Sequence, residues 1–180
     1  MQAGERGNAP ADFEKIVTEH SSFVYNVAYR MMGSHEEAEE VVQDTFLSAY
    51  RARDRFRGAS QVTTWLYRIA VNAALMRLRK KSRKVEVPTD PAVIVAKHDS
   101  PDQAATPDQA ALGGELAEVI QKAIGTLPPE LRAAVVLRDV QGLTNEEAAG
   151  ALEISVSALK TRLHRGRVAL RAHLAPYLAK

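Results

Sequence analysis

The sequence predicts an all-α protein made of two small helical domains joined by a flexible linker. Three observations support this prediction. Residues 11–84 contain no alternating apolar and polar pattern of a strand. A proline-rich stretch of low apolar content follows, and helical spacing of apolar residues then resumes. The predicted boundaries are a disordered N-terminus over 1–10, a first domain over 11–84, a linker over 85–112 and a second domain over 113–180.

The first domain is predicted to open with two long helices. The first runs from near Ala11 to Met32 and stops at Gly33. Ser34 and Glu37 then have the spacing of a capping box, in which the hydroxyl and the carboxylate each bind a free backbone amide. The second helix is expected to reach about Phe56.

A third helix is predicted to begin near Gln61, after the break at residues 58–60, and to run into a basic segment. Its apolar side chains recur at helical spacing and are expected to face the core. They are Trp65, Leu66, Ile69, Ala73 and Met76.

The segment over 85–112 is predicted to be an extended linker. It holds Pro88, Pro91, Pro101 and Pro107, together with scattered acids and alanines. Such a composition buries too little apolar surface to offset the entropy of ordering the chain.

The second domain is predicted to be helical from about Glu115. Pro129 suits the first turn of a helix that ends near Gln141. Thr144 and Glu147 form a second capping box before a short helix, and Ser155 is expected to cap a long last helix.

The composition excludes several classes of function. Hydrophobic residues make up 46% of the 180 residues, which suits a globular protein with a packed core. The sequence holds no cysteine, so disulfides, thiolate zinc sites and cysteine nucleophiles are absent. No apolar run has membrane-spanning length, and residues 1–10 lack the pattern of a signal peptide. We therefore expect a cytoplasmic protein without membrane insertion, and no cofactor or metal is implied.

The formal net charge is only +2, but the charges are strongly segregated. Residues 36–44 carry five acids and no base, residues 77–84 carry six bases and no acid, and no acid follows Glu153. Polyanion contact at the two basic segments and a basic partner at the acidic one would explain this pattern. Each run also fits an ordinary solvated helix face.

The two helices at the C-terminal end have the layout of a helix-turn-helix DNA reader. In the last helix an apolar set shares one face: Val156, Leu159, Leu163, Leu170 and Leu174. Thr161, His164 and Arg165 point most nearly away from that face and are flanked by Lys160, Arg162, Arg167 and Arg171. Such a polar and basic face suits a major groove, although an ordinary amphipathic helix would have a similar pattern.

Both domains resemble one family, the extracytoplasmic-function (ECF) sigma factors of bacterial RNA polymerase. Residues 37–52 (EAEEVVQDTFLSAYRA), 55–58 (RFRG) and 64–72 (TWLYRIAVN) are similar to region 2 of these factors. Region 4 is similar to residues 127–130 (LPPE), 143–149 (LTNEEAA) and 159–167 (LKTRLHRGR). The resemblance implies a factor that directs promoter-specific initiation and catalyses nothing itself.

For region 2, the resemblance implies contacts with core RNA polymerase and with the −10 promoter element. Glu40, Gln43 and Asp44 match positions that dock on the clamp helices of the largest polymerase subunit. The positions that match −10 contacts are Arg57, Ser60, Asn72, Arg77, Arg79, Lys80 and Lys81. Asn72 corresponds to the pocket for an unpaired base. Trp65 lies on the apolar stripe, so core packing is the better interpretation of that residue.

For region 4, the resemblance implies reading of the −35 element as duplex DNA. The matching positions are Lys160, Thr161, Arg162, His164, Arg165 and Arg167. The linker would then thread along the RNA exit path of the polymerase. Glu153 and Ser157 stand where the family often has glycine or another small residue, which bears on the turn conformation and the promoter sequence.

The resemblance also implies control by an anti-sigma protein that binds both domains. The rival hypothesis is an autonomous helix-turn-helix regulator that binds operator DNA without polymerase. It accounts for the C-terminal helices but not for the region 2 motif or the acidic face. An enzyme is disfavoured because no Asp, Glu or His lies in a recognisable catalytic or metal-ligand spacing.

Overall fold

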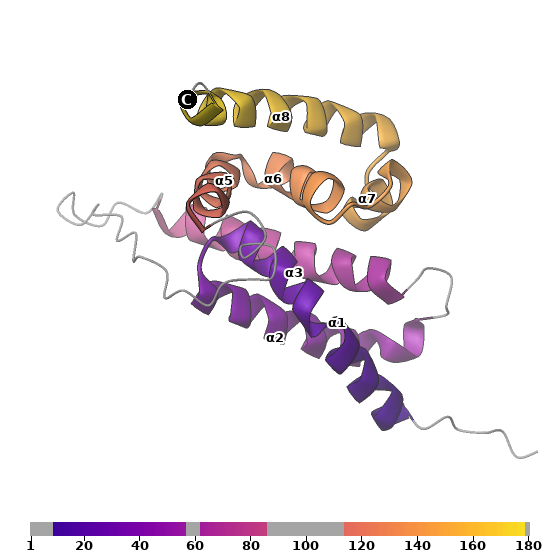
Figure 1. The fold of residues 1–180 in the computed structure, drawn as a ribbon. Coiled ribbons are helices and arrows are strands. Elements are labelled where there is room, and N and C mark those ends of the chain that lie inside the picture. The colour runs from indigo at the N-terminus through magenta and orange to yellow at the C-terminus, as the bar shows by residue number, and fades with distance from the viewer. Residues whose placement is uncertain (1–8, 57–61, 86–113, 179–180) are drawn as a thin grey trace, which may run out of the picture.

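The structure is a computed structural model that describes residues 9–56, 62–85 and 114–178. All regular secondary structure in these ranges is helical, which confirms the predicted all-α class (Figure 1). In chain order the elements are α1 (Ala9–Met32), α2 (His35–Ala52), the 3₁₀ turn η1 (Arg53–Arg55), α3 (Val62–Val85), α5 (Gly114–Thr126), α6 (Pro129–Val135), the π-helical turn η2 (Val136–Val140), α7 (Asn145–Leu152) and α8 (Val156–Leu178).

Helices α1, α2 and α3 pack against one another as the first unit, and α5 to α8 form the second. Side chains that are fully buried lie at the centre of each unit, including Met31, Val41 and Leu66 in the first, and Leu137 and Leu159 in the second. Within the described ranges, no helix is both long and apolar enough to span a bilayer.

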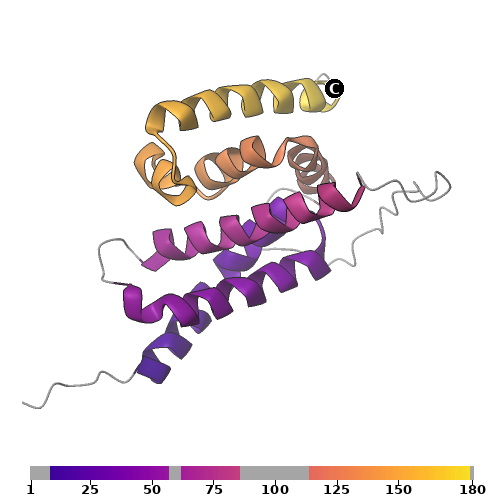
Figure 2. The same cartoon turned by 180° about the vertical axis from the view of Figure 1, so that it is seen from behind.

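The two units are packed together, which the sequence did not indicate. The second unit lies over the first as a separate layer in both views (Figures 1 and 2). The joining contacts are made by α1 with α5, α6 and η2, and by α3 with α6 and α7. The predicted linker over 85–112 lies outside the described residues except for Val85, as does most of the predicted N-terminal segment over 1–10.

The break between α1 and α2 follows the sequence prediction in part. Gly33 ends α1 with a φ of 78°, a left-handed conformation that glycine adopts without steric cost. Ser34 Oγ accepts a hydrogen bond from Glu37 N at 3.5 Å, as predicted. The other half of the capping box is not formed, because the Glu37 carboxylate instead accepts from Lys81 Nζ at 2.9 Å.

The predicted capping box at the start of α7 is confirmed. Glu147 N donates to Thr144 Oγ1 at 3.2 Å, and Thr144 N donates to Glu147 Oε2 at 2.8 Å. The hydrogen bond from the Thr144 backbone, followed by that from its hydroxyl, lowers the pKa of the Glu147 carboxyl. This cap therefore weakens when acid protonates Glu147, and it is intact above the usual glutamate range.

The turn between α7 and α8 is built on Glu153, which has φ 55° and ψ 41°. This left-handed conformation closes α7, and Ser155 Oγ then accepts from Ala158 N at 3.1 Å, as predicted for the cap of α8. A glutamate in this region of φ and ψ costs energy that a glycine would not. The structure thus forms the helix-turn-helix turn without the glycine that the family often has.

The predicted core face of α3 is wrong at one position. Trp65 and Leu66 are buried as expected, but the side chain of Met76 is 69% exposed. Tyr67 and Leu75 are buried instead. Helix α3 contacts both α1 and α2 on one side and α7 on the other, so that its buried surface is wider than one apolar stripe and includes Tyr67 and Leu75.

Candidate nucleic-acid interface

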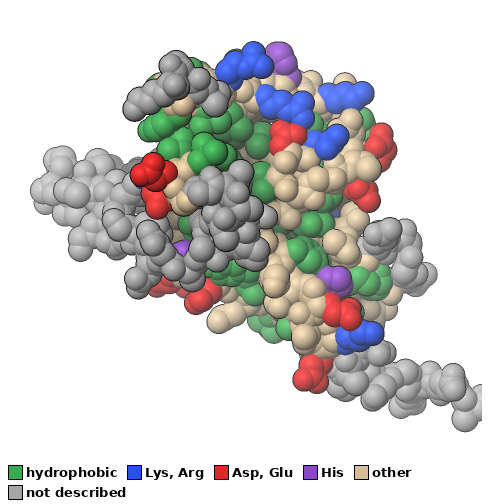
Figure 3. All heavy atoms as spheres, in the orientation of Figure 1, with side chains coloured by type: hydrophobic (Ala, Val, Ile, Leu, Met, Phe, Trp, Pro, Cys, Tyr) green, Lys and Arg blue, Asp and Glu red, His purple; other side chains and the backbone are tan. Residues whose placement is uncertain are grey.

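The outer face of α8 carries the polar and basic side chains predicted to read duplex DNA. Lys160, Thr161, His164, Arg165 and Arg167 are exposed, while Leu159 and Leu163 on the opposite face are buried. Lys and Arg side chains gather along this helix on the surface of the molecule (Figure 3). The helix therefore presents its basic side outward, as its periodicity indicated.

A close backbone contact fixes how this face is presented. An added Cβ at Gly166 would lie 2.8 Å from Val135 Cγ2 and 3.6 Å from Leu131 O, so α8 approaches α6 more closely than any other residue would allow. Gly166 itself is buried. The orientation of the outer face thus depends on packing beneath it.

Two of the six predicted contact residues on α8 are engaged with acids. Arg167 makes a two-pronged pair with Asp139, at 2.9 Å from Nε and 2.6 Å from Nη2, and this hydrogen bonding raises the arginine pKa. Arg162 Nη1 lies 3.1 Å from Glu130 Oε2. Thr161 donates a hydrogen bond to the Ser157 carbonyl at 3.1 Å. The side chains of Lys160, His164 and Arg165 form no hydrogen bond or ion pair with another residue that the structure describes.

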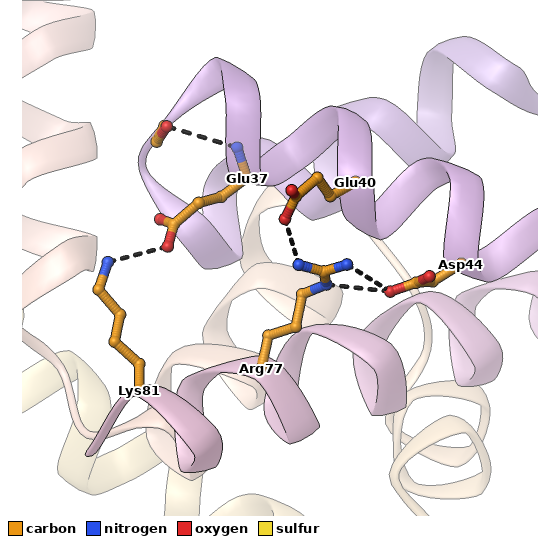
Figure 4. Close-up of polar contacts among 6 residues, drawn as sticks. Glu37, Glu40, Asp44, Arg77 and Lys81 are labelled. Atoms are coloured by element: carbon orange, nitrogen blue, oxygen red, sulfur yellow. Dashed lines mark hydrogen bonds and ion pairs between the residues drawn. The ribbon is translucent and has the colours of Figure 1, made fainter. Parts of the chain in front are cut away.

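Three acidic residues of α2 pair with the basic segment of α3 (Figure 4). Arg77 lies between Glu40 and Asp44: its Nε and Nη2 are 3.0 and 2.7 Å from Asp44 Oδ2, and its Nη1 donates to Glu40. The hydrogen bond to Asp44 is the main reason that the pKa of Arg77 is raised. One turn further along α3, Lys81 pairs with Glu37. We call these five residues the charge ladder.

The remaining residues predicted for the −10 element differ in their surroundings. Asn72 and Lys80 are exposed on α3, and Arg79 Nη2 lies 2.8 Å from Glu130 Oε1. Arg57 and Ser60 lie outside the described residues. Of the predicted polymerase-binding set, Gln43 is exposed and shares its helix face with Glu40 and Asp44.

The two aromatic residues of α3 are buried. Trp65 is 7% exposed and packs against Phe56 at a ring-centroid distance of 4.8 Å, which confirms core packing. Tyr67 contacts Phe23 at 4.7 Å, and its hydroxyl donates to Gln141 at 3.3 Å. Burial raises the pKa of Tyr67.

Several polar contacts could not be predicted from the sequence, because the two residues of each contact are far apart in the chain. Glu130 binds arginines of both units, although its only signal was membership of the LPPE motif. Gln121 and Arg132 bind carbonyl groups of α1 across the unit boundary. In the sequence, Gln121 and Arg132 stand among apolar residues of the second unit, and this pattern does not indicate partners on α1.

Comparison with known proteins gives the family of both units. The model of sigma-70 region 2 matches residues 16–84, and that of sigma-70 region 4 matches residues 117–170. The ECF RNA polymerase sigma factor SigW of Bacillus subtilis is 36% identical over 166 residues, covering 90% of this chain and 88% of SigW. SigE of Mycolicibacterium smegmatis, also an ECF RNA polymerase sigma factor, is 34% identical over 176 residues, and the match spans 97% of this chain but 65% of SigE.

Solved structures agree with this assignment. The sigma factor RpoE of Bartonella quintana, determined in complex with the anti-sigma factor NepR, matches with a TM-score of 0.69 at 26% identity, over 91% of this chain and 97% of RpoE. CnrH in complex with the cytosolic domain of CnrY matches with a TM-score of 0.65 at 28% identity, over 94% and 91% of the two chains. The chain therefore belongs to the ECF sigma factors, the non-enzymatic factors of RNA polymerase that act in transcription initiation.

Proposed function

We propose that this chain binds core RNA polymerase through α2, reads the −35 element with α8, and reads and opens the −10 element with α3 and the segment before it. The observation that carries the proposal is the exposed polar and basic face of α8, set on a capped helix-turn-helix. The proposed regions keep the boundaries drawn from the sequence: region 2 over 11–84, a linker over 85–112 and region 4 over 113–180.

The α8 face supports a division of labour in duplex DNA. Arg165 is exposed, points away from the buried side and has no acidic partner among the described residues, which suits base readout such as pairing with guanine. His164 and Thr161 share this outward face. Lys160, Arg162 and Arg167 lie beside it, where they suit phosphate contacts that set the position of the helix in the groove.

The α2 face supports docking on the clamp helices of the largest polymerase subunit. Glu40, Gln43 and Asp44 are spaced so that they share one helix face. Leu47 and Tyr50, which are 49% and 43% exposed, continue the same face toward the end of α2. An acidic patch beside exposed apolar side chains suits a basic partner that also buries apolar surface.

In region 2, promoter binding requires the basic residues to exchange partners. Asn72 and Lys80 are exposed and accessible to DNA, and we assign Asn72 to the unpaired base. Arg77, Arg79 and Lys81 are paired with carboxylates and must leave them to bind phosphates. Arg57 and Ser60 are assigned to the same element. Trapping a flipped base would favour the opened DNA and so drive melting.

We further propose that the protein acts in the cytoplasm under the control of an anti-sigma protein. The two structural relatives reported above are in complexes, RpoE with an anti-sigma factor and CnrH with the cytosolic domain of CnrY. Both match this chain across regions 2 and 4, so that a partner of similar type could bind both regions here.

The test is run-off transcription with purified core polymerase and a pool of promoter fragments. Arg165→Ala should lower promoter-specific transcription by at least about fivefold, since a good arginine–guanine contact contributes roughly 1–3 kcal/mol of discrimination. Lys122→Ala is the matched control, because Lys122 is an exposed cation of the same region on α5. Equal output from Arg165→Ala and the control would refute the assignment of α8 to the −35 element.

A further inference from the structure

Glu130 occupies a position between the two regions. It lies in the first turn of α6, and its two carboxylate oxygens accept from different regions: Oε1 from Arg79 Nη2 at 2.8 Å and Oε2 from Arg162 Nη1 at 3.1 Å. Arg79 belongs to the proposed −10 surface and Arg162 to the proposed −35 surface. One acid of the chain thus occupies an arginine from each DNA-binding surface.

Region 4 also caps the C-terminal end of α1. The last carbonyl groups of a helix lack partners within it and carry partial negative charge. Here Gln121 Nε2 donates to the Tyr29 carbonyl at 3.2 Å and to the Arg30 carbonyl at 3.5 Å, while Arg132 Nη1 donates to the Met31 carbonyl. Gln121 and Arg132 are only 7% and 8% exposed.

Further contacts from α1 and α3 reach region 4. Arg30 Nη1 donates to Gln121 Oε1 at 3.0 Å, and the Tyr67 hydroxyl donates to Gln141 at 3.3 Å. Arg68 lies 3.7 Å from Glu153, the residue on which the helix-turn-helix turn is built. The Arg68–Glu153 pair is exposed, but the contacts of Gln121 and Arg132 with α1 are buried. These buried contacts define one arrangement of the two regions, because each group would lose its partner if the regions slid past one another.

We infer that this packed arrangement is a resting state of the free protein, in which Glu130 acts as a latch that keeps Arg79 and Arg162 from DNA. The inference rests on the proposed function, which assigns these arginines to promoter contacts. Phosphates compete with the Glu130 carboxylate for the same guanidinium groups. Binding of a bipartite promoter, whose two elements must be contacted at once, then requires the latch to break.

The strength expected of the latch is modest. Glu130 is 40% exposed and Arg79 60% exposed, so solvent screens these ion pairs. Of the two pairs, only Arg79–Glu130 joins the two regions, because Glu130 and Arg162 both belong to region 4, and one exposed pair of this kind biases the closed state by about twofold. The buried hydrogen bonds of Gln121 and Arg132 to α1 stabilise the closed state separately, because they do not involve Glu130.

The distance between the regions in free solution tests the inference without DNA. The chain has no cysteine, so cysteines introduced at the exposed positions Ser48 and Ala172 can carry a single pair of fluorophores. Single-molecule energy transfer should give a dominant population at one short distance for the full chain. Glu130→Gln should increase the long-distance population about twofold. Gln121→Ala, which removes the hydrogen bonds to the Tyr29 and Arg30 carbonyl groups without changing charge, should also increase it.

Glu118→Gln is the control. Glu118 lies on α5, pairs within that helix with Lys122 and loses the same charge on substitution, so it should leave the distance distribution unchanged. If Glu130→Gln behaves like this control, or if the unsubstituted chain samples long distances throughout, the latch is overturned.

A second readout separates the latch from the proposed function. In run-off transcription at limiting concentration, Glu130→Gln should support more initiation than Glu118→Gln, by about the factor that the distances give. A shift in distance without a gain in initiation would overturn the masking of DNA contacts. If the unsubstituted chain supports no core-dependent initiation, the proposed function is refuted. The measured distances would still report whether Glu130 holds the two regions together.

Discussion

The two proposed DNA-binding surfaces differ in what occupies their basic residues. On α3, Arg77, Arg79 and Lys81 are each paired with a carboxylate of the same chain. On the outer face of α8, His164 and Arg165 have no such partner among the described residues. A run of bases in a sequence therefore does not imply a free basic surface. Whether it is free depends on the acids that the fold brings beside it.

In region 2, the charge ladder pairs bases of α3 with acids of α2. Helices α2 and α3 pack side by side, and acids at Glu37, Glu40 and Asp44 meet bases at Arg77 and Lys81, which are 33 to 44 residues away in the chain. The acids proposed to bind polymerase are thus the ones that hold Arg77. Under the proposed function, a polymerase that binds these acids would release Arg77 for DNA.

The α8 face depends on packing instead of on charge, and Gly166→Ala tests this with the largest expected effect on stability. The added methyl group would meet Val135 at 2.8 Å, and overpacking of this kind costs about 1–3 kcal/mol. Chemical denaturation should show that loss in the free energy of unfolding. Gly150→Ala is the control in α7, where an added Cβ meets nothing within 4 Å and the helix should gain slightly. Equal effects of the two substitutions would contradict the packing account.

Glu153→Gly sharpens the comparison by improving the turn that holds α8. Relief of the left-handed conformation should raise the free energy of unfolding by about 1 kcal/mol, after allowing for the greater freedom of glycine in the unfolded chain. The lost pair with Arg68 is weak at 3.7 Å and exposed. Gly142→Ala is the matched test of opposite sign, since Gly142 has φ 74° and open space around it. A destabilising Glu153→Gly would refute strain at this turn.

Asp44→Asn should have the smallest effect, below about 1 kcal/mol, because the charge ladder is partly exposed. The loss in the free energy of unfolding should be clear at low salt and should shrink in high salt, where exposed ion pairs are screened. Glu39→Gln on the same helix is the control, because Glu39 is exposed and forms no ion pair with another described residue. A loss that does not change with salt would mean that Asp44 acts by packing and not by charge.

Local signals in the sequence predicted the elements and the α8 face well. The Thr144–Glu147 capping box, the Ser155 cap and the outward position of Arg165 all depend on residues within a few turns of one helix, where spacing decides geometry. The burial of Tyr67 and Leu75 was missed because α3 contacts both units, and the packing of the second unit on the first has no signal in the spacing of α3. The Glu130 contacts were missed for a related reason: their partners lie 32 and 51 residues away, and no periodicity encodes such pairs.

The proposed function requires that this chain read promoter DNA only together with core polymerase. The most direct measurement follows start-site selection and DNA protection on a promoter pool with the chain alone, core polymerase alone, and both together. The proposed function predicts discrete start sites, with protection at two spaced elements, only when the chain and core polymerase are both present. Tight binding of the chain alone at a discrete site, with no stimulation of core polymerase, would contradict the proposed function and favour an autonomous helix-turn-helix regulator.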